Sequence, residues 1–200
     1  MSESFLDNPV KAMFVLALLY LPLGFFLWFF ASSLLMFPAG RLAEWLLTSA
    51  FPEVFEGLVQ LNFQFEIQTA IILSRPVDGR EVALDLFVNP MVYAWGMALL
   101  FGLVMATPLA VTQRMVQLLI SFAVITGVTV WGVFWETLTD LAFRSGPEAG
   151  EVAAGLGVPM DLIALFYQLG FLMLPAVVPV ALWILMNRAF VEQHVLRRSH

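Results

Sequence analysis

The chain has 200 residues, of which 61% are hydrophobic and 12% are charged, with a formal net charge of −6 and no cysteine. Soluble domains are about 45–50% apolar and about 25% charged, so this composition leaves too little polar surface for a soluble enzyme. The mean hydropathy of +0.90 predicts an integral membrane protein. The net charge is negative, which does not suggest a nucleic-acid-binding protein. The absence of cysteine excludes disulfides and thiolate chemistry.

The first apolar segment runs from about Ala12 to Phe37, with no charge between Lys11 and Arg41. A bilayer core about 30 Å thick needs about 20 apolar helical residues, so this segment is long enough to cross. It is longer than the apolar region of a signal peptide, and no clear small-residue cleavage site follows it. We therefore expect residues 1–37 to form an N-terminal tail and an uncleaved first span.

The connection from Pro38 to Asn89 is the one extramembrane module that we expect. It begins with residues 41–47, where Leu42, Trp45 and Leu46 share one helical face, the pattern of an interfacial helix on the outer leaflet. From there, polar and apolar residues alternate with a period of two over 59–68. That alternation predicts a strand with one apolar face.

A turn signal at 75–79 and a second alternating run at 81–88 complete a predicted β-hairpin. A lone hairpin is marginal in water, so its apolar side must lie against something. Packing on the protein's own helices is the commoner use of such a face. Docking of another protein is the alternative, in which case Phe63 and Phe65 are candidate contacts.

The second predicted span starts near Asn89-Pro90 and ends near Gln113-Arg114. Small residues recur on it every four positions, which places them on one face where another helix approaches closely. This face serves either packing within the chain, the commoner case, or a partner protein. The candidate partner contacts are Ala94, Ala98, Gly102 and Ala106, with Ala110 continuing the series and Tyr93 and Trp95 beside it.

The third predicted span covers residues 115–135 and continues as a helix to about Phe143. Its end carries a charged ladder, Glu136, Asp140 and Arg144, whose spacing of four lets Arg144 pair with Asp140. Carboxylates inside a membrane are functional hypotheses by default, but charge costs little near the interface. We therefore favour interfacial anchoring, and the alternative is that Glu136 pairs with a base on the outer loop or on a partner.

The fourth predicted span runs from about Leu162 to Met186, closed by Asn187-Arg188. Pro175 and Pro179 remove helical hydrogen bonds and predict a bend. The neighbouring residues are apolar, so the bend indicates packing rather than a transport site. Residues 90–187 thus hold the second to fourth spans, and 188–200 form a basic tail.

Basic residues near the span ends set the expected orientation. With the N-terminus inside, the inner set lies at span ends with few acids nearby, whereas the outer set lies among many acids. We therefore expect both termini in the cytoplasm. The inner set is Lys11, Arg114, Arg188, Arg197 and Arg198, and the outer set is Arg41, Arg75, Arg80 and Arg144.

Catalysis is not expected. The only histidines, His194 and His200, lie in the C-terminal tail, and the spans pair no nucleophile with an activating base. Neither metal-ligand spacing nor a phosphate-binding glycine loop is present in the sequence. We predict no catalytic residue, no metal and no cofactor.

The junction Asn89-Pro90-Met91-Val92-Tyr93-Ala94-Trp95-Gly96 enters the apolar helix of the second span. Pro90 suits a first helical turn, and Tyr93 and Trp95 suit interface depth. The junction resembles the most recognisable stretch of the exosortase H-associated membrane proteins, in which an Asn-Pro, an aromatic residue and a Gly precede an apolar small-residue helix. The overall layout is also similar: one span, then an outer loop predicted to form strands, then three further spans.

This resemblance implies a multi-pass protein of a Gram-negative inner membrane that accompanies an exosortase, an enzyme that sorts exported proteins. The exosortase itself depends on a Cys, with Arg and His; this chain has no Cys and no histidine within a span, so it fits only the accessory partner. The resulting expectation is an all-α membrane protein with four transmembrane helices, an outer β-hairpin and an interfacial helix.

Two other functions remain open from the residues alone. The first is a small transporter or channel component with an outward-facing acidic path through Glu136, Asp140, Tyr167 and Gln168. The second is a structural bundle that lies in the lipid bilayer and needs no other protein. The apolar hairpin and the lack of polar groups at midmembrane depth favour an accessory protein that binds another membrane protein.

Overall fold

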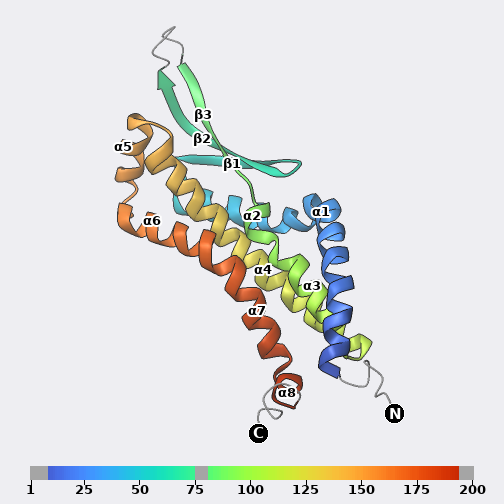
Figure 1. Ribbon diagram of the computed structural model, residues 1–200. Helices are drawn as coiled ribbons and strands as arrows, with labels where there is room; N and C mark the ends of the chain where they lie inside the picture. The colour runs from blue at the N-terminus through green and yellow to red at the C-terminus, as the bar shows by residue number, and fades with distance from the viewer. Residues whose placement is uncertain (1–8, 75–80, 194–200) are drawn as a thin grey trace, which may run out of the picture. The chain divides into compact units, whose positions relative to one another are not determined.

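The computed structural model describes residues 9–74 and 81–193, which are mostly helical with one small sheet (Figure 1). The predicted turn at 75–79, the tail residues Arg197 and Arg198 and both histidines lie outside the described residues. The helical elements are α1 (Pro9–Ala50), α2 (Met91–Ala94), α3 (Gly96–Ala106), α4 (Val111–Thr139), η2 (Asp140–Arg144), α5 (Pro147–Gly155), α6 (Met160–Gln168), η3 (Leu169–Met173), α7 (Leu174–Met186) and α8 (Arg188–Val191).

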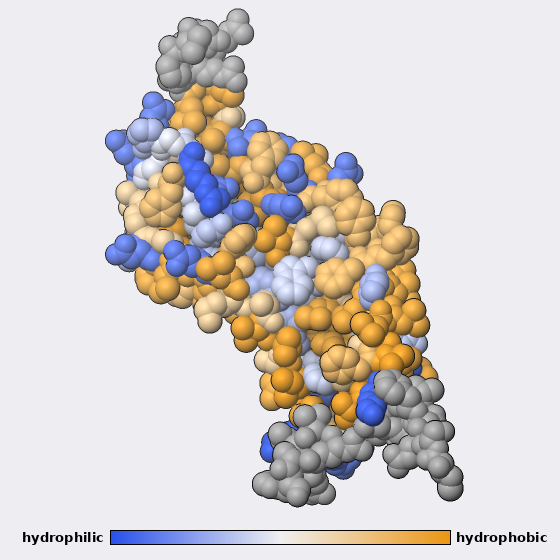
Figure 2. Space-filling model, viewed as in Figure 1, coloured by the Kyte–Doolittle hydropathy of each residue, from blue (hydrophilic) through white to orange (hydrophobic). Residues whose placement is uncertain are grey.

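Three helical stretches in the described part of the chain are long and apolar enough to cross a membrane: Val10–Ala50, Val111–Arg144 and Met160–Met186. They coincide with the first, third and fourth predicted spans. A backbone in lipid must satisfy its hydrogen bonds internally, which is why uninterrupted apolar runs become helices. Much of the helical surface visible in Figure 2 is hydrophobic, as a lipid solvent requires.

The second predicted span is shorter than expected. Its apolar helix covers Met91–Ala106 and does not reach Gln113-Arg114. Thr107 leaves the helical region (φ −76°, ψ 137°) because Pro108 follows it, and a proline disfavours the α conformation in the preceding residue. The helical stretch rises about 24 Å at about 1.5 Å per residue, less than a bilayer core of about 30 Å. Four full-length spans are therefore not confirmed.

Helix α1 differs from the expected division into a span and a separate interfacial helix. It is continuous over 42 residues, through Pro38, to Ala50. The residues predicted to form the interfacial helix are the C-terminal part of this single helix. Its 42 residues rise about 63 Å along the path of the helix, about twice what one membrane crossing needs.

The described residues form two compact units. The first consists of residues 9–31, 95–125 and 175–193, and the second of 32–74, 81–94 and 126–174. In the first unit α3 packs against α1 through small residues: a Cβ added at Gly102 would lie 2.6 Å from Leu21 Cδ2, and one at Gly24 would lie 2.8 Å from the Ala98 carbonyl oxygen. Such close approach is the use of small residues expected between helices in lipid.

The second unit contains the sheet, β1 (Phe55–Leu61), β2 (Gln64–Ser74) and β3 (Glu81–Val88), antiparallel in the order β1-β2-β3. The predicted single strand over 59–68 is wrong. The chain turns at Asn62 and Phe63, where Asn62 adopts a φ of +51°, and Leu61 pairs with Gln64. The module is a three-stranded meander and not one hairpin.

This turn changes which side chains share a face. Directly paired residues of antiparallel strands point to the same side, so Leu58 lies with Ile67, and Val59 lies with Glu66. The expected apolar face is therefore divided between the two sides of the sheet. The inner side is buried and contains Leu58, Phe65, Ile67, Leu86 and Val88.

The inner side of the sheet covers the C-terminal part of α1 (Figure 1). Gly40 permits the contact: a Cβ there would lie 3.1 Å from the Phe65 ring. The buried hydrophobic side chains of α1 are spaced three and four apart, the pattern of one helical face, and they are Met36, Ala39, Ala43 and Leu47. Leu42 and Trp45 lie off this face and are exposed.

Candidate functional site

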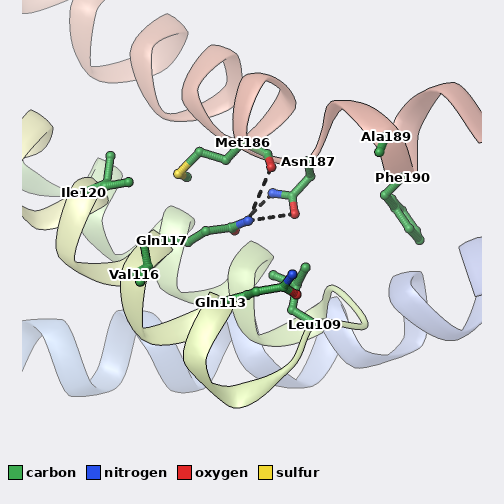
Figure 3. A pocket seen from close by; sticks show the side chains of 9 residues that line it. All are labelled: Leu109, Gln113, Val116, Gln117, Ile120, Met186, Asn187, Ala189 and Phe190. Carbon is green, nitrogen blue, oxygen red and sulfur yellow. Dashed lines mark hydrogen bonds between the residues drawn. The ribbon is translucent and has the colours of Figure 1, made fainter.

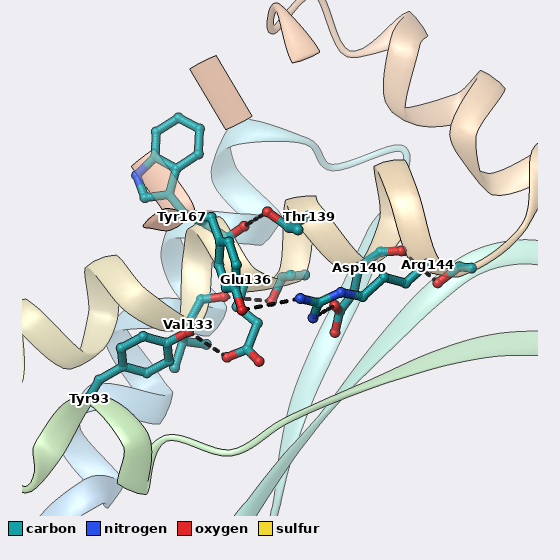
Figure 4. Close-up of polar contacts among 10 residues, drawn as sticks. Tyr93, Val133, Glu136, Thr139, Asp140, Arg144 and Tyr167 are labelled. Carbon is teal, nitrogen blue, oxygen red and sulfur yellow. Dashed lines mark hydrogen bonds and ion pairs between the residues drawn. The ribbon is translucent and has the colours of Figure 1, made fainter. Parts of the chain in front are cut away.

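A polar cluster in the second unit joins α2, α4, η2 and α6 (Figure 4). The buried Tyr93 donates a hydrogen bond of 2.7 Å from its hydroxyl to Glu136 Oε2. Its ring occupies space that Gly132 leaves open, since a Cβ at that glycine would lie 2.2 Å from Tyr93 Cδ1. The local sequence thus pairs a glycine on α4 with an aromatic residue on α2 and brings the hydroxyl to the carboxylate.

The rest of the cluster lies one turn further along. Arg144 Nη1 donates to Asp140 Oδ1 at 2.6 Å, the ion pair that the spacing of four predicts. Arg144 Nη2 also donates to the Tyr167 hydroxyl at 3.1 Å, and its guanidinium lies 5.2 Å from the centre of that ring. Asp140 is therefore neutralised within the chain, and Tyr167 shares its cation.

Glu136 differs from Asp140 in its partners. Across the described residues, no Lys or Arg forms an ion pair with Glu136, and its one hydrogen-bond donor is Tyr93. A carboxylate can accept about four hydrogen bonds, so this half-buried group retains acceptor capacity. It is chemically able to receive a cation or a proton.

Aromatic rings pack beside the cluster. Trp131, Trp135 and Phe166 are in mutual contact, with ring centroids 4.7 to 5.9 Å apart. The Trp131 Nε1 group donates to the Phe166 carbonyl at 3.2 Å, which holds α4 and α6 together. These tryptophans therefore have a packing role within the unit.

A second polar site lies in the first unit, where α4 meets the end of α7 (Figure 3). Gln117 Nε2 donates to Asn187 Oδ1 at 3.0 Å, and Asn187 Nδ2 donates back to Gln117 Oε1 at 3.1 Å. Both amides are buried and line an open cavity of about 420 Å³ whose other walls are mainly apolar. All amide hydrogens of the pair are used, because Gln117 also reaches the Met186 carbonyl and Asn187 that of Trp183.

The structure places the predicted contact residues in different surroundings. The small residues Ala94, Ala98, Gly102 and Ala106 are all buried within the chain, whereas Ala110 is exposed. Tyr93 is buried and Trp95 is half-buried. Of the two phenylalanines, Phe65 is buried against α1 and Phe63 is exposed at the β1–β2 turn.

Sequence reasoning missed two pairings. Tyr93 was expected as an interface aromatic and as a candidate partner contact, and no local sequence pattern indicates its hydrogen bond to Glu136. The Gln117–Asn187 pair was not singled out. A usable signal was present, because each residue places an amide in or at the end of an apolar helix, and such groups hydrogen-bond to one another across helices in lipid. Within the described ranges, no group of three or more histidines or acids is placed to hold a metal ion.

The comparisons with known proteins bear on the whole chain. No curated protein and no solved structure matches it. The sequence model of one family, described as exosortase H-associated membrane protein, matches residues 7–190. That match covers both polar sites, the sheet and every long apolar helix, and the chain belongs to the family of exosortase H-associated membrane proteins.

Proposed function

We propose that this protein is a non-catalytic accessory subunit that partners an exosortase-type membrane enzyme, one that sorts exported proteins. The observation that carries the proposal is the family match over residues 7–190, because the family is described by its association with exosortase H. The chain has no cysteine, so it cannot itself supply a thiolate nucleophile. Its part in sorting is then to bind the enzyme or its substrate.

The proposed location is the bacterial inner membrane, with both termini in the cytoplasm. Three crossings would leave the termini on opposite sides, so this topology needs α2 and α3 to act together as a short fourth span. Thinning of the bilayer or snorkelling of flanking residues accommodates a short apolar stretch at modest cost. Residues 38–89 are then the extracytoplasmic module.

In this arrangement the C-terminal part of α1 lies along the outer interface. Support comes from its two faces: one is buried beneath the sheet, and the apolar residues Leu42 and Trp45 are exposed away from that face. Tryptophan is enriched at headgroup depth, where its ring is apolar and its N–H is polar. The sheet would thus be separated from the membrane by α1.

The test is crosslinking in native membranes, followed by affinity purification in a mild detergent and mass spectrometry. An exosortase-type enzyme at near-stoichiometric amounts supports the proposal. A matched control is an unrelated multi-pass protein carrying the same tag at the same expression level. A chain that elutes alone, or only as a homo-oligomer, contradicts the proposal.

A second candidate function, a transporter or channel component, draws on the Glu136 site. A half-buried carboxylate without a cation in the described chain resembles the proton-accepting groups of membrane carriers. Asp140 and Tyr167 are already engaged by Arg144, and Gln168 is exposed. This function would be favoured if reconstituted vesicles show flux and the Glu136→Gln variant loses it. It would be excluded if vesicles with the protein show no more flux than empty vesicles.

A further inference from the structure

The outer side of the sheet mixes apolar and acidic side chains. Glu66 is the central residue of one cross-strand row, paired with Val59 on β1 and with Phe87 on β3. Val59 is 40% exposed and Phe87 is 54% exposed, so Glu66 lies between two accessible apolar side chains. The next row places Asp85 beside Gln68, and Leu61, 46% exposed, extends the apolar part toward the turn.

Lipid tails cannot cover this side. The sheet has three strands in the order β1-β2-β3 and is therefore open at both edges. An open sheet in hydrocarbon would leave edge N–H and C=O groups unsatisfied, and only helices and closed barrels avoid that cost. The sheet consequently lies outside the hydrocarbon core, where a cluster of exposed apolar side chains indicates a contact surface for a protein or for the membrane interface.

The acidic residues of the strands indicate the charge of the partner. Across β1, β2 and β3 there are four acidic residues, Glu56, Glu66, Glu81 and Asp85, and no basic residue. An anionic membrane surface would be repelled. A second copy of this chain docking by the same face would place like charges against each other. A cationic protein segment is the occupant with complementary charge.

We propose that the outer side of the sheet docks a cationic segment of the partner protein. A Lys or Arg of that segment binds Glu66, and apolar side chains on either side of it contact Val59 and Phe87. A charge-assisted hydrogen bond supplies specificity, and the aromatic ring supplies the buried contact. This inference rests on the proposed function and names the surface and the chemistry by which the partner is recognised.

The experiment places the photo-crosslinker benzoylphenylalanine at Phe87 in the full chain in its native membrane. The matched position is Glu151, which is also exposed and lies on α5 of the same unit. The expected result is a crosslink from position 87 to the exosortase-type enzyme, and none from position 151. Mass spectrometry of the crosslinked peptide should find a Lys or Arg flanked by apolar residues.

Charge variants test the role of the acids. Glu66→Lys with Asp85→Lys should lower the crosslink yield at position 87 by about tenfold, or about 1.4 kcal/mol, since each reversed charge would repel the Lys or Arg of the docked segment. The milder Glu66→Gln with Asp85→Asn keeps the side-chain shape and should lower it by about threefold. Glu148→Lys with Glu151→Lys, the same change in charge on α5, should leave the yield unchanged.

Two results would overturn the inference while leaving the proposed function intact. One is co-purification of the enzyme with the parent chain but no crosslink from position 87. The other is a crosslinked segment without Lys or Arg, or a yield insensitive to the charge variants. If the parent chain does not co-purify with the enzyme at all, the proposed function fails, and the inference fails with it.

Discussion

The Tyr93 hydroxyl and Glu136 Oε2 are 2.7 Å apart although the two residues are separated by 43 positions in the chain. The bond links α2 to α4 inside the second unit and gives Glu136 its hydrogen-bond donor among the described residues. A carboxylate in an apolar helix is costly unless it is hydrogen-bonded. The tyrosine therefore makes this acid tolerable whatever further role Glu136 has.

Removing that donor should destabilise the protein. Tyr93→Phe keeps the ring against Gly132 but deprives Glu136 of its hydrogen bond, with an expected loss of about 1–3 kcal/mol. The measurement is the unfolding midpoint in detergent. Tyr20→Phe, a half-buried tyrosine of α1 outside the cluster, is the matched control and should change little. In the double variant with Glu136→Leu the loss should shrink, because no carboxylate is left without its hydrogen-bond donor; a full additive loss would contradict the pairing.

Two glycines of α4 should respond oppositely to alanine. A Cβ at Gly132 would lie 2.2 Å from Tyr93, so Gly132→Ala must displace a buried ring and should cost about 1–3 kcal/mol. A Cβ at Gly127 meets nothing within 4 Å, so Gly127→Ala should gain about 0.5–1 kcal/mol from helix propensity. Unfolding midpoints of the two variants decide the matter. Equal effects at both positions would show that the Tyr93 ring does not pack on Gly132.

The fold could be predicted from sequence wherever one physical rule dominated. The three long helices follow from apolar runs, because a helix satisfies the backbone hydrogen bonds of a single segment in lipid without help from any other strand. The turn at Asn62 was missed because apolar and polar residues continue to alternate through it. The alternation by itself therefore predicts one continuous strand. The local signal was the asparagine itself, which tolerates positive φ better than most residues.

The polar sites were predictable only where they were local. The spacing of Asp140 and Arg144 on one helix predicts their ion pair, which is present at 2.6 Å. The Tyr93–Glu136 and Gln117–Asn187 bonds join distant parts of the chain. Which of several polar residues meet depends on helix packing, and packing in lipid is set by small residues and shape more than by hydrophobicity.

The Gln117–Asn187 pair should behave as a coupled unit. Asn187→Leu removes one partner and leaves the buried Gln117 amide with unused hydrogen-bonding groups, at an expected cost of about 1–3 kcal/mol. Gln117→Leu with Asn187→Leu should cost less than the sum of the single variants, since neither amide is then orphaned. A denaturant-unfolding cycle in detergent measures the coupling. Gln168→Leu, at an exposed position, serves as the control and should be nearly neutral.

The proposed topology depends on whether α2 and α3 cross the membrane, and labelling with single cysteines settles it. The chain has no cysteine of its own, so each introduced one is unique. Gln64 and Thr112 are both exposed, and among the described residues between them the apolar helix Met91–Ala106 is the one candidate crossing. If that helix spans, the two positions lie on opposite sides; if it does not, they lie on the same side.

We expect a membrane-impermeant maleimide applied to spheroplasts to label Gln64→Cys and to label Thr112→Cys only after permeabilisation. Glu151→Cys, exposed on α5 beyond α4, should label like Gln64→Cys, because two crossings separate those positions. This variant also controls for reagent access, since its position does not depend on the interfacial placement of α1. Labelling of Thr112→Cys together with Gln64→Cys in intact spheroplasts would mean three crossings and would place the C-terminus outside the cytoplasm if the N-terminus is inside.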